Sequence, residues 1–233
     1  MTLKLFPAIA AFLLFTSSAL AGQFEEGVAA RNRGDFTNSL RIFAELASKG
    51  DVRAQSNLGF MYENGEGVTT NYAEAFKWYR LAAQQGQPIA QFNLGVRYET
   101  GQGVKQNFAE AANWYRKAAT QGHVTAQRNL GSLFAEGRGV LHDDTEAVKW
   151  FRLAAVQGNP YAQSDLGAMY GRGLGVAHDS VRAYMWFSIS ATKGNSIAAA
   201  NMRMAERVMT APQIQQAKIE EQACLQKNLR GCN

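Results

Sequence analysis

The residues of this chain that could carry catalytic or metal chemistry are few. The three histidines are His123, His142 and His178, and none forms the His-x-x-x-His or His-x-x-Glu pattern that presents two metal ligands from one helical face. A single loop histidine could act as a general base, but an isolated histidine in a loop usually does not. We therefore expect no catalytic residue, no metal site and no cofactor.

Serines and glycines are the next candidates for chemistry. Ser56, Ser132 and Ser164 lack the Gly-x-Ser-x-Gly and Ser-x-x-Lys contexts of activated serine nucleophiles. A Gly-x-Gly pattern occurs at residues 65–67, where it could suggest a phosphate cradle, but it follows a predicted helix and lacks the third glycine. It recurs in three further places, so we interpret it as a turn that needs positive φ angles.

The two cysteines, Cys224 and Cys232, suggest a disulfide instead of redox or metal chemistry. Cysteines of an exported chain usually pair in the oxidising compartment that they reach. Closing so short a loop stabilises the fold by roughly 2 to 3 kcal/mol in the chain-entropy model.

The elements that must position any site follow from a repeat of 36 residues. Each copy runs Ala-Gln-x-x-Leu-Gly, Gly-x-Gly-Val, Ala-x-x-Trp and Ala-x-x-Gly, and such self-similarity is typical of solenoids and related arrays. The four blocks are 54–89, 90–125, 126–161 and 162–197.

Within a block, apolar residues recur at helical spacing twice, on either side of the glycine connection. Asn71 and Asp143 precede a glutamate by three positions, which predicts an N-cap and a capping box for the second helix. Gly86 and its equivalents predict the left-handed residue that ends this helix, and Pro88 and Pro160 cannot extend it. Each block is therefore predicted to be a helical hairpin.

One glycine lies inside the first helix of every block, where it costs about 1 kcal/mol relative to alanine. Close approach of the two helices would offset this cost, and we expect Trp78 and its equivalents to pack over Gly59 and its equivalents. The same argument predicts that Trp→Ala destabilises the fold by roughly 3 to 5 kcal/mol in any block.

The residues Leu58-Gly59-x-Met61-Tyr62-x-x-Gly65-x-Gly67-Val68, followed by Ala75-x-x-Trp78-Tyr79-Arg80-x-Ala82-Ala83-x-x-Gly86, resemble the Sel-1-like repeat, a relative of the tetratricopeptide repeat. The resemblance implies an all-α, right-handed superhelical solenoid of antiparallel helix pairs whose concave side binds proteins or peptides. Residues 22–53 look like a divergent tetratricopeptide-like hairpin. Residues 198–233 are predicted to form C-terminal capping helices and a tail, with one helix starting at Thr210.

Positions that are constant among the blocks should serve packing, and positions that vary are free for binding. The variable positions of the first helix share one face and are the candidate partner-binding residues Ser56, Phe60, Glu63, Phe92, Val96, Glu99, Arg128, Ser132, Ser164 and Ala168. Phe60 and Phe92 could anchor a partner, or could belong to the core, and Arg128 could bind a carboxylate. Asn57, Asn93 and Asn129 form a nearly constant polar column that could contact a ligand or a neighbouring repeat. The constant glutamines, Gln55 among them, favour a structural hydrogen bond.

Residues 1–21 have the pattern of a secretory signal peptide, with Lys4, an apolar stretch and a small-residue cleavage site ending at Ala21. A retained anchor is the alternative. We expect a periplasmic or secreted chain with no transmembrane segment after cleavage, and a monomer. The net charge of +5 is spread along the chain without a basic run, which argues against nucleic acid.

The resulting hypothesis is a non-catalytic adaptor of the cell envelope that binds a protein or peptide in its groove. One alternative is the penicillin-binding or β-lactamase activity ascribed to cysteine-rich members of the resembling family. Those relatives carry a cysteine pair in each repeat, and this chain has none there. The other alternative is a secreted factor that acts on a host.

Overall fold

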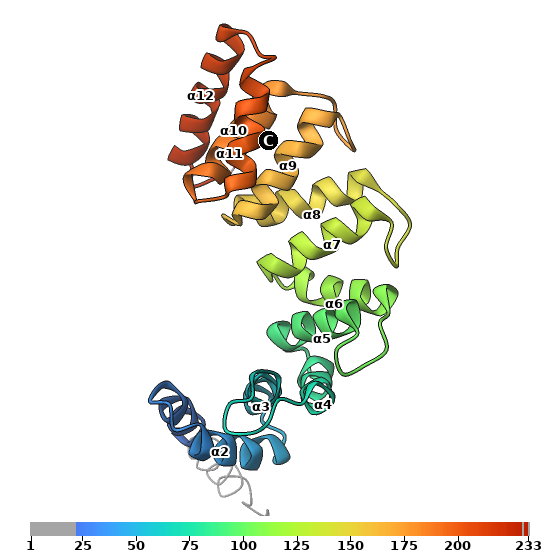
Figure 1. Cartoon of the computed structure of the whole chain (residues 1–233), viewed down its shortest axis with the longest axis vertical. Helices are drawn as coiled ribbons and strands as arrows, with labels where there is room; N and C mark the ends of the chain where they lie inside the picture. The colour runs from blue at the N-terminus through green and yellow to red at the C-terminus, as the bar shows by residue number, and fades with distance from the viewer. Residues whose placement is uncertain (1–21, 230, 233) are drawn as a thin grey trace, which may run out of the picture. The chain divides into compact units, whose positions relative to one another are not determined.

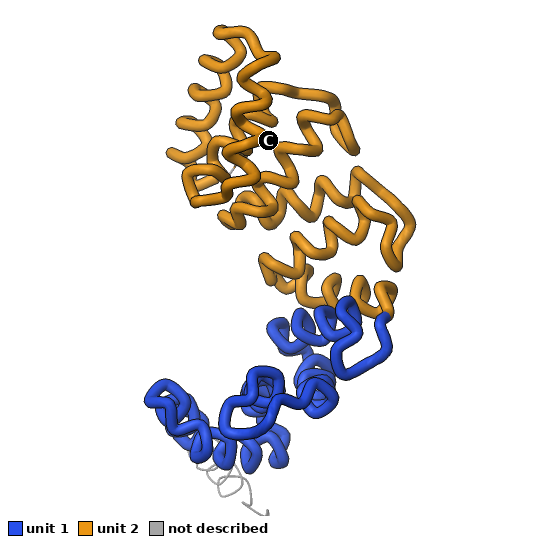
Figure 2. Tube along the Cα trace, viewed as in Figure 1, with its two compact units in different colours: residues 1–106 blue, residues 107–233 orange. Residues whose placement is uncertain are grey.

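The structure is a computed structural model that describes residues 22–229, 231 and 232. It divides into two compact units, residues 1–106 and 107–233 (Figure 2). Every regular element in the described part is a helix, so the all-α class is confirmed (Figure 1). None of the described helices is long and apolar enough to cross a membrane. The predicted signal peptide lies outside the described residues.

In the first unit, residues 22–32 are helical and pair with α2 after a short turn. Gly27 faces Phe43 of α2, and a Cβ at Gly27 would lie 2.8 Å from that ring. The following helices pack in consecutive pairs, α2 on α3, α3 on α4 and α4 on α5. Their bounds are α2 Phe36–Ser48, α3 Val52–Asn64, α4 Tyr72–Gln84 and α5 Pro88–Thr100.

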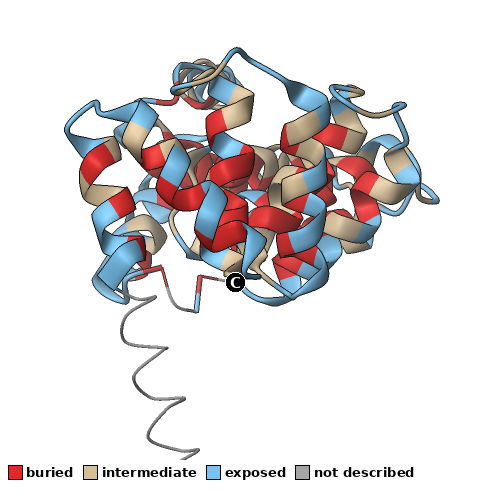
Figure 3. Cartoon of the chain, turned by 90° about the horizontal axis from the view of Figure 1, so that it is seen from below, coloured by how far each residue is buried: buried red, intermediate tan, exposed pale blue. Residues whose placement is uncertain are grey.

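The second unit continues the same pattern and ends differently. Consecutive helices pack from α6 to α11, and α12 then returns to pack on α10. The bounds are α6 Phe108–Thr120, α7 Val124–Glu136, α8 Asp144–Val156, α9 Pro160–Arg172, α10 Ser180–Thr192, α11 Ser196–Glu206 and α12 Ala211–Gln226. Along the helices, buried and exposed positions alternate, as an amphipathic element that packs on its neighbours requires (Figure 3).

The first helix of each block begins two residues before the start of the sequence block, at Val52 in the first copy. Pro88 and Pro160 therefore stand at the first helical position, where the missing N–H has no partner to lose. These prolines therefore begin helices and do not terminate the preceding ones. Gly86 and Gly158, two residues earlier, adopt φ angles of 90° and 92° and end the preceding helices, as predicted.

The N-caps of the second helices are confirmed. The predicted capping box does not form at Asn71, because the backbone amide of this residue donates to another group. Asn71 accepts from the amides of Ala73 and Glu74. The amide of Asn71 donates to the carbonyl of Tyr62 at 2.8 Å, and Glu74 pairs with Lys77. Because the hairpin connection folds back onto the first helix, the backbone satisfies the donor that a capping box would leave to glutamate.

The glycine connections are turns, as predicted, with φ angles of 73° at Gly65 and 72° at Gly67. Gly67 also contacts the start of the preceding second helix, where a Cβ would lie 2.6 Å from the Phe36 carbonyl oxygen. The same contact recurs at Gly103, Gly139 and Gly175. The second glycine is thus required twice, by its own backbone conformation and by a close approach between neighbouring blocks.

The prediction that tryptophan packs over the helical glycine is wrong by one position. A Cβ at Gly59 would lie 2.8 Å from the ring of Tyr79, the residue after Trp78. Gly131 and Gly167 face Phe151 and Phe187 in the same way. The ring of the residue after the tryptophan faces the partner helix, because this position lies on the buried side of the second helix.

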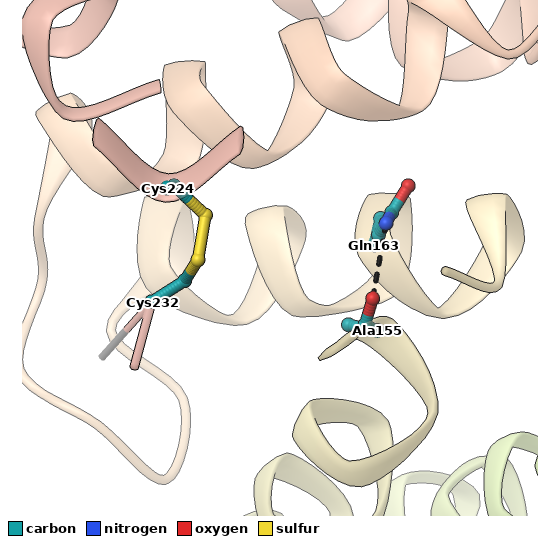
Figure 4. The surroundings of a disulfide bond; sticks show 4 residues. All are labelled: Ala155, Gln163, Cys224 and Cys232. Atoms are coloured by element: carbon teal, nitrogen blue, oxygen red, sulfur yellow. Dashed lines mark hydrogen bonds between the residues drawn. A yellow bond between two sulfur atoms is a disulfide. The ribbon is translucent and has the colours of Figure 1, made fainter. Parts of the chain in front are cut away.

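The tail after α12 is closed by the Cys224–Cys232 disulfide, with Cα atoms 5.3 Å apart (Figure 4). The helix that precedes it begins at the predicted place, and Thr210 and Gln213 form a reciprocal capping box. Cys224 lies in the last turns of α12, so the bond holds the tail against the end of that helix.

The tryptophans differ in burial, and their contributions to stability should differ accordingly. Trp186 is fully buried, whereas Trp78 is half-buried. We expect Trp186→Ala to lower the free energy of unfolding by about 3 to 5 kcal/mol and Trp78→Ala by less than half as much. Urea unfolding followed by circular dichroism measures both values, with Trp186→Phe as the volume control. Equal losses in the two alanine variants would contradict this assignment.

Candidate protein-binding surface

In the first unit, part of the variable first-helix face lines a shallow pocket of about 130 Å³, which we call the unit 1 pocket. It is formed by α3, the start of α5 and one residue of the N-terminal helix. Of the predicted binding residues, the structure brings Ser56, Asn57, Phe60 and Asn93 together here. The full lining is Arg31, Ser56, Asn57, Phe60, Gln87, Ile89 and Asn93.

Phe60 is the most accessible predicted anchor, since 37% of its surface is exposed. The guanidinium of Arg31 lies 4.3 Å from the centre of its ring, a cation–π contact. Arg31 also donates two hydrogen bonds to Glu66, at 2.6 and 3.0 Å, which raise the pKa of the arginine. The charge of Arg31 is therefore already neutralised, and the pocket offers an aromatic face with amide and hydroxyl groups around it.

Glu63 faces the interior of the first unit instead of the unit 1 pocket. Its carboxylate accepts from the Tyr79 hydroxyl at 2.7 Å and from Arg97 at 3.0 Å. Burial, followed by the charge and hydrogen bond of Glu63, raises the pKa of Tyr79 well above its usual range. Glu63 thus takes part in an internal polar network.

Arg97 is the residue of this network that the sequence analysis missed. It is 5% exposed and occupies the column that holds Met61, Leu133 and Met169 in the other blocks, all of them buried. Its Nε and Nη1 atoms are buried without a hydrogen-bond partner among the described residues. The signal in the sequence is a single charge in a column that is otherwise apolar.

This buried pair predicts an unusual response to substitution. Arg97→Met restores the side chain of the equivalent positions, and we expect the free energy of unfolding to stay within about 1 kcal/mol of the native value or to rise. In this variant the Glu63 carboxylate would still accept the hydrogen bond from the Tyr79 hydroxyl and would remain partly exposed to solvent. Glu63→Gln, which leaves Arg97 buried without a carboxylate, should cost about 3 to 5 kcal/mol. Urea unfolding measures both, and a severe loss in Arg97→Met would show that the ion pair is needed for stability.

The remaining candidate binding residues of the first unit lie on α3 and α5. Asn57 donates to the carbonyl of Arg53 at 2.9 Å, a bond within its own helix. Phe92, Val96 and Glu99 are half-buried on α5 and do not line the unit 1 pocket.

In the second unit, Arg128 already binds a carboxylate of the chain itself. Its Nε lies 2.8 Å from Asp165, and its guanidinium lies 5.8 Å from the ring of Tyr161. Burial raises the pKa of Asp165, and the hydrogen bond and charge of Arg128 offset part of that effect. Asp165 stands in the column that Asn57, Asn93 and Asn129 occupy in the other blocks.

The raised pKa of Asp165 predicts the direction of a pH effect. Because the folded chain holds this proton more tightly than the unfolded chain does, stability falls as pH rises from the unfolded pKa, about 3.9, through the folded one. Asp165→Asn removes this dependence and matches the asparagine of the other blocks. We expect the variant to gain stability relative to the native chain at neutral pH, and the gain to shrink as the solution is acidified.

Urea unfolding over the acid-to-neutral range measures that difference. Arg128→Gln is the control, since it keeps the carboxylate and removes the group that offsets its burial, so it should steepen the pH dependence. A gain that grows on acidification would contradict the assignment.

The other second-unit candidates lie at different depths. Ser164 is buried, and the Ser132 hydroxyl donates to the carbonyl of Arg128 at 3.3 Å. Asn129 is half-buried on α7.

Ala168 lines an apolar recess of about 450 Å³, which we call the terminal groove. This groove is formed by α9, α10, α11 and the connection between α9 and α10. Its lining residues are Ala168, Gly171, Arg172, His178, Ser180, Ala183, Phe187, Asn201, Met204, Ala205 and Val208.

The histidines have separate positions. His123 caps α7 by accepting from the Ala126 amide at 3.2 Å, and His142 lies 3.3 Å from Asp144. His178 lines the terminal groove. Within the described residues, no three histidine, cysteine or acidic side chains gather as a metal site would require.

Tandem helical hairpins with recesses along their first helices define a helix-pair repeat protein. The Sel1 repeat model matches residues 52–87, 88–123, 124–159 and 160–195, so the chain belongs to the Sel1 repeat family. Proteins of this family generally act as scaffolds for protein–protein interaction and are typically not catalysts. No match was found among the curated proteins.

Solved structures resemble most of the chain. A protective antigen present in uropathogenic Escherichia coli strains, displaying an SLR fold, has a TM-score of 0.79 at 32% identity, covering 91% of this chain and 47% of the antigen. This chain therefore spans about half the length of that protein. A Sel1 repeat protein from Oxalobacter formigenes has a TM-score of 0.72 at 37% identity, over 78% of this chain and 74% of its own. A putative Sel1 repeat protein from Klebsiella pneumoniae, at 20% identity and a TM-score of 0.51, shares the fold over 80% of this chain and 93% of its own.

Proposed function

We propose that the protein is a non-catalytic scaffold of the cell envelope that binds a protein or peptide along its first-helix faces. The observation that carries the proposal is that recesses in both units are lined by positions that vary among the blocks. Ser56 and Phe60 line the unit 1 pocket, and the equivalent positions Ser164 and Ala168 lie on α9, with Ala168 in the terminal groove. Variation at recessed, partly apolar positions is what a repeat array uses to distinguish partners.

The chemistry of the unit 1 pocket fits a peptide chain. The unit 1 pocket combines the Phe60 ring and Ile89, which is 53% exposed, with the side-chain amides of Asn57, Gln87 and Asn93. Amides can donate to and accept from a peptide backbone, while apolar groups receive side chains.

We propose that the protein is located outside the cytoplasm. The Cys224–Cys232 disulfide supports this, because such bonds persist in oxidising compartments. A secreted factor that acts on a host is the second candidate, and it is favoured by the similarity to the E. coli protein described as a protective antigen. Comparing the amount of the protein in washed periplasm with the amount in the culture supernatant distinguishes the envelope scaffold from the secreted factor.

The test of the scaffold function is capture from a periplasmic extract with cross-linking, followed by titration of the captured partner against purified variants. Phe60→Ala should weaken binding of that partner at least about 10-fold, since exposed aromatic anchors carry much of an interface's energy. It should lower the melting temperature only about as much as Leu81→Ala, because the two side chains have similar exposure, 37% and 41%. Phe92→Ala tests the second predicted anchor in the same assay.

Leu81→Ala is the matched control, because Leu81 is 41% exposed on α4 and lies outside the unit 1 pocket. Equal weakening by Phe60→Ala and Leu81→Ala would refute the first-helix surface. Turnover of the chromogenic β-lactam nitrocefin above background would refute the non-catalytic assignment.

A further inference from the structure

The terminal groove is hollow because its lining residues are small where α9 and α10 meet. Ala168 and Gly171 of α9 line it together with Ala183 of α10, and a Cβ at Gly171 would lie 3.4 Å from the Ala183 Cβ, an ordinary contact. Phe187 adds an aromatic surface to the lining. Helix packing therefore does not require a glycine at position 171. The absence of a larger side chain there leaves open space above α10.

The side of the groove formed by α11 is apolar and open to solvent. Met204 is 63% exposed and Val208, just after α11, is 83% exposed, one helical turn apart. Asn201 occupies the column of Asn57, and Met204 that of Phe60, so the groove continues the variable face of the blocks past the last of them.

The charged side chain that lines the groove is a cation, Arg172. Arg172 and His178 belong to the lining, and no carboxylate does. Within the part of the chain that the structure describes, Arg172 has no ion pair or hydrogen bond from its side chain, in contrast to Arg31 with Glu66 and Arg128 with Asp165.

The carboxylates nearest in sequence to the lining residues are already engaged elsewhere. Asp179 accepts from the amide of Arg182 at 2.9 Å and pairs with its guanidinium, and Glu206 accepts from the Tyr184 hydroxyl at 2.8 Å. The groove therefore presents apolar surface beside an arginine whose charge is not compensated by an ion pair with any of the described residues.

We propose that the terminal groove binds a partner segment that carries large apolar side chains next to an aspartate or glutamate. The apolar side chains would fill the hollow above Ala183 and Phe187, and the carboxylate would pair with Arg172, whose planar guanidinium suits bidentate binding. This inference rests on the proposed scaffold function and names the chemistry of the partner at one site. It requires the carboxylate as well as the apolar groups, so it excludes basic and purely aliphatic segments.

The experiment selects peptides from a random display library against the oxidised full chain and measures their binding by fluorescence polarisation. We expect selected sequences enriched in Leu, Ile or Phe beside Asp or Glu. Val208→Asp and Arg172→Glu should each weaken them by about 10-fold or more, and Arg172→Lys by less, since lysine keeps the charge without the bidentate geometry. Raising the ionic strength should weaken binding to the native chain and have little effect on Arg172→Gln.

Leu141→Asp is the matched control, because Leu141 is 89% exposed in the second unit and does not line the groove. Thermal unfolding of each variant verifies that these exposed substitutions leave the fold intact.

Peptides without acidic residues, or peptides that bind Val208→Asp and Arg172→Glu as tightly as the native chain, would overturn the inference. If such peptides are lost in Phe60→Ala, the scaffold function stands and only the terminal groove assignment fails. A library that yields no binding peptide counts against both.

Discussion

The interaction on which the array depends is a hydrogen bond between neighbouring blocks that one glutamine makes in each copy. Gln55, Gln91, Gln127 and Gln163 donate to the carbonyls of Ala47, Ala83, Ala119 and Ala155 at 3.0 to 3.3 Å. Figure 4 shows the last of these bonds, from Gln163 to Ala155. All four side chains are at most 4% exposed. Each satisfies a carbonyl in the last turn of one helix from the start of the next, where helix geometry leaves backbone groups without partners. The helical glycines and the glycine connections then determine how closely the same helices approach.

The constant columns made most of the fold predictable from the sequence, because packing and turn geometry demand particular residue types. The helix pairs, the N-caps at Asn71 and Asp143, the positive φ angles at Gly65 and Gly67 and the structural glutamines all follow from local rules. The tryptophan contact was wrong, since a period of 36 fixes which residues are equivalent but not which of two adjacent rings faces the partner helix. Arg97 escaped prediction for a related reason, as its burial depends on Glu63 and Tyr79 of a different block.

The candidate binding surface was less predictable than the fold. The sequence identified the face that contains Phe60 and Ala168, because variation among the copies is visible in one chain. It could not show that Glu63 and Arg128 form ion pairs within the protein, or that Arg172 forms none among the described residues, since such pairs join residues about 35 positions apart. A charge on a variable position therefore indicates binding only after its partners within the chain are known.

The Arg97–Glu63 pair has a consequence for how this array could have grown and how it could be rearranged. Most contacts between blocks join residue types that recur in each copy, so duplication or exchange of blocks would reproduce them. A second block moved behind the third would instead bring Arg97 beside the position of Ala135, with no carboxylate for a buried guanidinium. The first two blocks are therefore no longer interchangeable modules, and a repeat protein of nearly uniform parts has a fixed order at this junction.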